Sequence, residues 1–97
     1  MLPQDDWHNP NSPDLFEAIL SLENAQEVEA FFRDLCTRKE LDEMSQRWAV
    51  VLLLSEGIPY REIAEKTGAS TATVTRINQW LQHGTGGYRM VLERRNR

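Results

Sequence analysis

Apolar residues recur along the N-terminal part of the chain at intervals of three and four, the spacing that puts them on one side of an α-helix. A first stripe follows Ser12 and Pro13, where a serine N-cap and a proline at the first helical position mark a helix start. A second follows Asn24, with Glu27 placed as its capping-box partner. The two stripes comprise Leu15, Phe16, Ile19, Leu20 and Leu22, then Val28, Phe31, Phe32 and Leu35.

A third pattern is apolar beyond a single stripe. Thr37 with Glu40 repeats the capping signal and predicts a helix that extends to about Glu56. Its second half is apolar all round, and a helix of that kind is buried on every side. Because 97 residues offer few elements to cover it, we expect a second subunit to contribute. The alternative is a well-packed central helix of a monomer. The residues that complete the apolar surface are Ala49, Val50, Leu53 and Leu54.

Glycine and proline divide the rest of the chain. Gly57 and Pro59 end the third helix, and short helices are then expected at residues 60–67 and 71–82. The stretch "HGTGG" precedes a last helix at about residues 88–95. With no strand pattern and no internal repeat, the chain is predicted to be all-α: a flexible arm at residues 1–12 and one helical domain at residues 13–97.

Residues 60–82 have the internal spacing of a helix-turn-helix. Ala64 is small where the second helix must cross the first, and Gly68 accepts a positive φ in the turn. Val74 and Ile77 point inward from the second helix, and Ile63 meets them from the first. All these residue types at the right offsets predict a packed helix-turn-helix motif.

The opposite face of the second helix carries no acidic residue. Threonine hydroxyls bond base edges or phosphates, and arginine is suited to guanine or phosphate. Threonines are weak helix formers, so their retention on an exposed face favours a use in DNA reading over a face that simply meets water, as in an interaction hairpin. Tyr60 and Arg61 start the helix expected to cross the DNA backbone. The predicted reading face comprises Ser70, Thr71, Ala72, Thr75, Arg76 and Gln79, with Thr73 at its edge.

Charge is unevenly distributed and removes the objection that an acidic chain avoids DNA. The net charge is −4, but residues 1–56 hold four basic and twelve acidic residues, whereas residues 57–97 hold seven basic and three acidic ones. Salt screens distant charges, so the charges close to a bound DNA duplex have the largest effect on it. The relevant charge is therefore that of the basic half, which contains the helix-turn-helix. The terminal "RRNR" is expected to be a solvated tail that adds attraction to phosphate.

The sequence gives little indication of metal binding, catalysis or membrane insertion. A lone Cys36 and two histidines make no metal pattern, and no nucleophile and base constellation predicts an enzyme. The longest apolar run, "WAVVLLL", is too short to span a membrane, and the N-terminus does not read as a signal peptide. We therefore expect a cytoplasmic protein without a membrane partner.

From Leu35 to about Leu81 the chain resembles the tryptophan repressor family, in particular its YerC/YecD Trp-repressor-related branch. The resemblance rests on "LCTRKELDEMSQRWAVVLLLSEGIPYREIAEKTGASTATVTRINQWL", most specifically on "SQRW" and "GASTATVTR". It implies an intertwined helical homodimer with one DNA-reading head per subunit. The family's DNA contacts carry over onto Tyr60, Arg61, Thr71, Ala72, Thr73 and Thr75.

The resemblance also implies an amino-acid pocket, from which this chain departs. Arg47 and Arg76 match the two arginines that clasp a corepressor in the family. Ile77 replaces a glycine that leaves room for an indole ring, and Trp80 replaces a serine that binds the ligand's amino group. Trp80 is then expected to act as a built-in substitute, so that no L-tryptophan cofactor is needed. In that case Arg47 is structural, paired with an acid such as Glu43.

The sequence thus predicts a DNA-binding transcriptional regulator, a repressor that occupies a palindromic operator as a homodimer. Two alternatives belong to other classes: a helical protein-interaction module, and a DNA-binding accessory of a recombinase or transposase. The operator, the regulated genes and any small-molecule effector do not follow from the sequence.

Overall fold

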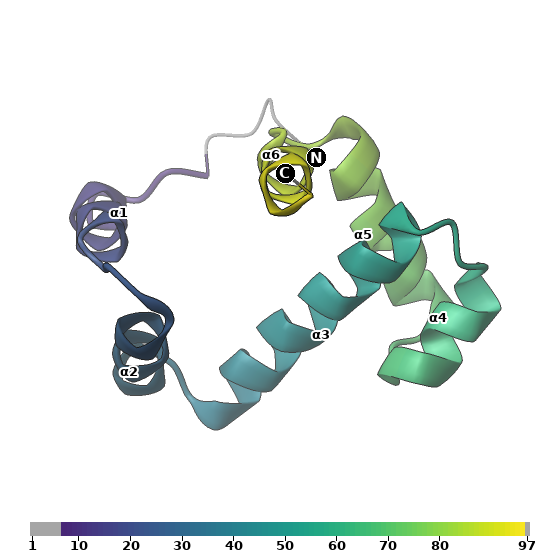
Figure 1. Cartoon of the computed structure of the whole chain (residues 1–97), viewed down its shortest axis with the longest axis horizontal. Coiled ribbons are helices and arrows are strands. Elements are labelled where there is room, and N and C mark those ends of the chain that lie inside the picture. Colours follow the sequence, from purple (N-terminus) through teal and green to yellow (C-terminus); the bar gives the residue numbers. More distant parts are fainter. Residues whose placement is uncertain (1–6, 97) are drawn as a thin grey trace. The chain divides into compact units, whose positions relative to one another are not determined.

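The computed structural model describes residues 7–96, and these form six α-helices and no strand (Figure 1). The all-α prediction is confirmed. Of the arm predicted at residues 1–12, residues 1–6 lie outside the described part, as does Arg97 of the basic tail. The helices are α1 (Ser12–Leu20), α2 (Ala25–Leu35), α3 (Arg38–Ser55), α4 (Tyr60–Thr67), α5 (Thr71–His83) and α6 (Gly87–Arg95).

The described chain divides into two units, residues 7–42 and residues 43–96. In the first unit, α3 begins as predicted: the Thr37 N–H donates to Glu40 Oε1 at 2.8 Å, and the Glu40 N–H donates to Thr37 Oγ1 at 3.1 Å. The start of α2 differs slightly from a capping box. Asn24 Oδ1 accepts from the Glu27 N–H, but the Glu27 carboxylate accepts from the N–H of Glu23, one residue before the cap. Ser12 likewise lies in the first turn of α1 and not at its N-cap.

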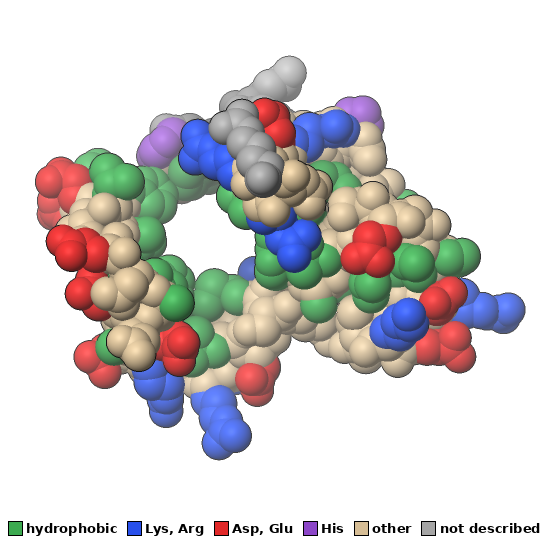
Figure 2. All heavy atoms as spheres, viewed as in Figure 1, with side chains coloured by type: hydrophobic (Ala, Val, Ile, Leu, Met, Phe, Trp, Pro, Cys, Tyr) green, Lys and Arg blue, Asp and Glu red, His purple; other side chains and the backbone are tan. Residues whose placement is uncertain are grey.

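The apolar stripes of α1 and α2 are in place but only partly covered. Neither helix has a buried residue, and Leu20 is 85% exposed. Figure 2 shows hydrophobic side chains beside carboxylates over these two helices. The stripes therefore offer apolar surface that a single chain leaves in water. Their other strongly exposed members are Phe16, Val28 and Leu35.

The second unit contains the buried core. Val50 and Val51 from α3 pack with Ile63 from α4 and Val74 from α5, all four fully buried. The predicted inward residues of the helix-turn-helix are thus core residues, with Ile77 also buried. The second half of α3 is covered only in part: Leu52, Leu53 and Leu54 keep intermediate exposure.

The turn between α4 and α5 is fixed by backbone geometry and by α3. Gly68 has φ +80°, and its N–H donates to the Ala64 carbonyl at 2.9 Å. Gln46 Nε2 from α3 donates to the Thr67 carbonyl at 3.1 Å. The Thr67 hydroxyl donates to the Ile63 carbonyl and accepts from the Ala69 N–H. These bonds satisfy the last carbonyls of α4 and hold α5 at a set angle.

Candidate nucleic-acid interface

The second helix of the motif, α5, has one buried face and one polar, exposed face. Val74, Ile77 and Leu81 are buried and fix the rotation of the helix. Ser70 is its N-cap: its Oγ accepts from the Thr73 N–H at 3.1 Å and lies 3.0 Å from Thr73 Oγ1. The predicted reading residues consequently face outward, with Thr73 of intermediate exposure; the exposed ones are Ser70, Thr71, Ala72, Thr75, Arg76 and Gln79.

Hydrogen bonds within α5 determine what this face offers to a ligand. The Thr75 hydroxyl donates to the Thr71 carbonyl at 3.0 Å. Its hydrogen is then engaged, and the oxygen lone pairs and the methyl group remain for a partner. Arg76 Nη2 donates to Thr73 Oγ1 at 3.3 Å, which leaves the other guanidinium donors available. The face combines acceptors, methyl groups and a cation without a carboxylate.

At the start of α4, Tyr60 and Arg61 are exposed, as their expected role at a DNA backbone requires. The Tyr60 oxygen accepts a hydrogen bond from Asn78 Nδ2 of α5 at 2.8 Å. Sequence reasoning missed Asn78. It is separated from Tyr60 by eighteen positions, and the only local sign is its place one turn after the buried Val74.

All four residues expected at an effector pocket line one pocket of about 570 Å³: Arg47, Arg76, Ile77 and Trp80. Glu43 and Tyr88 also line it. Among the described residues no ion pair joins Arg47 to Glu43, the acid suggested as its partner, and the structural role of Arg47 stays a prediction. Ile77 belongs to the core at 5% exposure, whereas Trp80 is 39% exposed.

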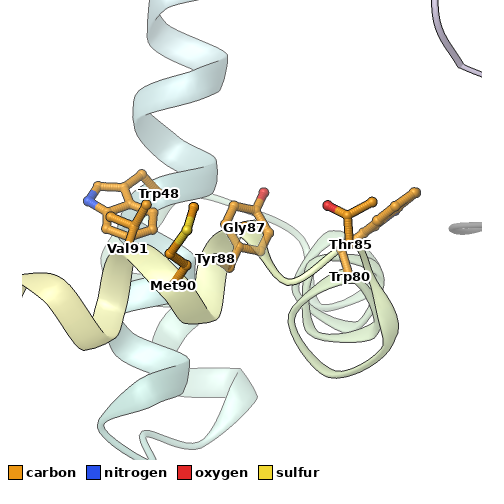
Figure 3. A pocket seen from close by; sticks show the side chains of 7 residues that line it. All are labelled: Trp48, Trp80, Thr85, Gly87, Tyr88, Met90 and Val91. Atoms are coloured by element: carbon orange, nitrogen blue, oxygen red, sulfur yellow. The ribbon is translucent and has the colours of Figure 1, made fainter. Parts of the chain in front are cut away.

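A second, apolar pocket of about 460 Å³ lies beside Trp80 (Figure 3). Trp48 comes from α3, and Tyr88, Met90 and Val91 come from α6. In Figure 3, Trp48, Met90 and Val91 gather on the side away from Trp80, and Tyr88 appears between them and Trp80. Trp80 and Tyr88 line both pockets, so these two rings border a polar pocket as well as an apolar one. The sequence patterns did not predict this apolar pocket.

Among residues 7–96 no group of three His, Cys, Asp or Glu side chains could hold a metal ion. No helix in that part of the chain is long and apolar enough to cross a bilayer.

The packed α4–Gly68–α5 unit with an outward polar face defines a helix-turn-helix protein. The chain belongs to the Trp repressor family, whose family model for the Trp repressor protein matches residues 11–96. The family is one of DNA-binding regulators, not of enzymes.

Three relatives support this assignment. An uncharacterized protein, YerC of Bacillus subtilis (strain 168), is 45% identical over 80 residues, which are 82% of this chain and 77% of that protein. A TrpR-like protein from Eubacterium eligens ATCC 27750 is 46% identical, with a TM-score of 0.86 over 91% of each chain. A candidate Trp repressor from Staphylococcus aureus is 43% identical, with a TM-score of 0.85 over 92% of this chain and 89% of that one.

Proposed function

We propose that this protein is a cytoplasmic transcriptional regulator that binds double-stranded DNA sequence-specifically as a homodimer and represses by occupying a palindromic operator. The observation that carries the proposal is the acid-free, outward face of α5, fixed by the burial of Val74 and Ile77 behind it. Membership of a family of DNA-binding regulators supports the same assignment.

The motif would bind with α5 in the major groove and the start of α4 against the backbone. Thr71 and Thr75 would contact base edges, with lone pairs facing amino donors and methyl groups facing thymine methyls. Ala72 permits close approach of the helix to the groove. Arg61 would hold a phosphate and set the register, a contact that carries no sequence information. Thr73, Arg76, Gln79 and Ser70 complete the interface.

Dimerisation is supported by the apolar surface that one chain leaves uncovered. Leu20 is almost fully exposed, and the second half of α3 is covered only in part. A second copy would bury these surfaces and pair the two reading heads. Successive major grooves on one side of a duplex are about 34 Å apart, which sets the spacing that the two copies of α5 must match.

Selection of bound sequences from a random DNA pool tests the proposal. A palindromic consensus with half-sites about one helical turn apart is expected, with affinity that falls as salt rises. Absence of salt-sensitive binding to any DNA would favour a protein-interaction module. Specific binding to a site without two-fold symmetry would favour an accessory of a recombinase or transposase.

We also propose that the reading head is competent without L-tryptophan. Ile77 and Trp80 line the expected effector pocket together with Arg47 and Arg76, and they are bulkier than the glycine and serine that the family resemblance places at these positions. This replacement of small residues by bulky ones supports exclusion of a free indole. Titration of L-tryptophan into the pure protein is expected to give no heat, and DNA affinity is expected to be the same with and without it. Micromolar binding of L-tryptophan would contradict this proposal.

A further inference from the structure

A chain of hydrogen bonds crosses the helix-turn-helix from α6 to the first residue of α4. Arg89 Nη2 of α6 donates to Gln82 Oε1 at 2.6 Å. Gln82 Nε2 donates to Asn78 Oδ1 at 3.4 Å, one turn earlier on α5. Asn78 Nδ2 then donates to the Tyr60 hydroxyl oxygen at 2.8 Å. The chain therefore starts on a guanidinium and ends on a side chain expected at the DNA backbone.

Every bond in this chain runs in the same direction. Arginine has donors only, so the amide of Gln82 must present its oxygen to Arg89 and its nitrogen to the next residue. The amide of Asn78 is oriented in the same way. Arg89 itself is anchored, because its Nε also donates to the Leu81 carbonyl at 2.9 Å. Because two acceptors hold the Arg89 guanidinium, it sets the orientation of the Gln82 amide and, through it, that of the Asn78 amide.

The last group in the chain is left with a free donor. The Tyr60 oxygen accepts from Asn78, and no residue in the described range 7–96 accepts the hydrogen of the Tyr60 hydroxyl. The side chain is 36% exposed. A hydroxyl that accepts one hydrogen bond becomes a stronger donor in the next. A phosphate oxygen can only accept hydrogen bonds, and so it is a suitable partner for the free hydroxyl hydrogen of Tyr60.

We propose that Asn78 is a positioning residue for DNA binding, which holds the Tyr60 hydroxyl so that its hydrogen points to a backbone phosphate, and that Arg89 and Gln82 orient Asn78. The proposal rests on the proposed DNA-binding function and adds to it a role for three residues outside the predicted interface. Because Tyr60 is a neutral donor, its contact affects affinity without releasing an extra counterion.

A double-mutant cycle tests the link between Asn78 and the Tyr60 hydroxyl. DNA affinity is measured on the selected operator for the parent protein, Asn78→Ala, Tyr60→Phe and the double variant, with folding checked by circular dichroism. Each single variant is expected to weaken binding about threefold to tenfold per reading head. In the Tyr60→Phe background, Asn78→Ala is expected to change affinity less than twofold. If Asn78→Ala weakened DNA binding equally in the parent protein and in Tyr60→Phe, Asn78 would have only a structural role and the proposal would be overturned.

Arg89→Lys provides a variant of equal charge on the exposed side of α6. The single ammonium nitrogen of lysine cannot replace both the Nε bond to the Leu81 carbonyl and the Nη2 bond to Gln82. DNA affinity is therefore expected to fall about twofold to threefold, with an unchanged dependence of affinity on salt concentration. This loss should vanish in the Tyr60→Phe background, and a loss that persists there would overturn the role of Arg89. If the parent protein binds no DNA, the proposed function and this inference fail together. If it binds and the cycle shows no coupling, only the inference fails.

Discussion

At the residue scale, Glu40 makes the start of α3 sensitive to acid. The backbone N–H of Thr37, and then the Thr37 hydroxyl, stabilise the carboxylate and hold the pKa of Glu40 below its ordinary value of 4.5. A lowered native pKa means that charged Glu40 stabilises the folded chain above about pH 4.5. This stability is lost as pH falls through the lowered pKa, and because the side chain is fully exposed the effect is small.

Replacement of the Glu40 carboxylate tests whether it makes the stability of the protein depend on pH. Glu40→Gln keeps an acceptor for the Thr37 N–H but removes the titration. The variant is expected to be less stable than the parent protein at pH 7, and the difference should shrink towards pH 3. Urea unfolding of both proteins at several pH values measures it, since the other carboxylates cancel in the difference. A difference that is independent of pH would contradict the assignment.

Single residues also mark where sequence patterns stop being informative. The bonds between Thr37 and Glu40 span three positions, so the local pattern predicts them. The bond between Asn78 and Tyr60 arises only when α4 and α5 pack, and no local spacing indicates it. The family resemblance predicts that Trp80 fills the amino-acid pocket, but its contribution to a second, apolar pocket depends on α6, whose packing the sequence does not specify.

At the scale of elements, the left-handed turn between α4 and α5 sets the geometry of the helix-turn-helix. Gly68 has φ +80°, a conformation that costs an L-residue about 1–2 kcal/mol. Gly68→Ala is expected to destabilise the protein by about that amount. A Cβ at this position would meet only Gln46 Nε2 at 3.7 Å, so the cost arises from the backbone and not from a clash.

Gly87→Ala is the matched control for that turn. A Cβ at Gly87 would have open space, and its φ lies outside the left-handed region. The control is expected to leave stability unchanged or to raise it by up to about 1 kcal/mol, because it reduces the entropy of the unfolded chain. Thermal unfolding of both variants compares them. Equal destabilisation by the two substitutions would show that the conformation of Gly68 is not the cause.

The outward face of α5 is tested by substitutions at Thr75. Because the hydroxyl donates to the Thr71 carbonyl, it can only accept from a base. Thr75→Val removes the acceptor but keeps a methyl group, whereas Thr75→Ala removes the methyl group as well. If a base donor is read, Thr75→Val should cost about 1–3 kcal/mol of discrimination at one base pair; if a thymine methyl is read, only Thr75→Ala should. An unchanged consensus for both, and for Thr71→Ala, would mean that another face binds DNA.

At the scale of the whole molecule, the core predicted from spacing accounts for only part of the apolar surface. Val74, Ile77 and Ile63 were predicted as inward residues and are buried. The stripes of α1 and α2 were predicted as stripes, yet neither helix has a buried residue. Periodicity identifies which face of a helix is apolar, but the partner that covers that face lies outside the local pattern. We therefore expect most of the missing burial to come from a second copy.

Two charge substitutions on α2 distinguish a dimer from a monomer. Val28 and Leu35 are seven residues apart, share one face of α2, and are 42% and 49% exposed in the single chain. In a monomer, Val28→Asp with Leu35→Asp would alter exposed positions and change stability by about 0.5 kcal/mol or less at each. In a dimer, the same carboxylates would be buried without partners and would cost several kcal/mol. Sedimentation equilibrium is expected to give a dimer for the parent protein and a monomer for the double variant.

The dependence of thermal stability on concentration completes this test. Folding coupled to association makes the midpoint of unfolding rise with protein concentration. We expect this rise in the parent protein and in Glu29→Gln, a control on an exposed position of the same helix that keeps the apolar face intact. The double variant should lose it, together with cooperative binding to the two half-sites. A parent protein whose midpoint is independent of concentration and which sediments as a monomer would refute the dimer, and the uncovered faces of α1 and α2 would then need a different partner.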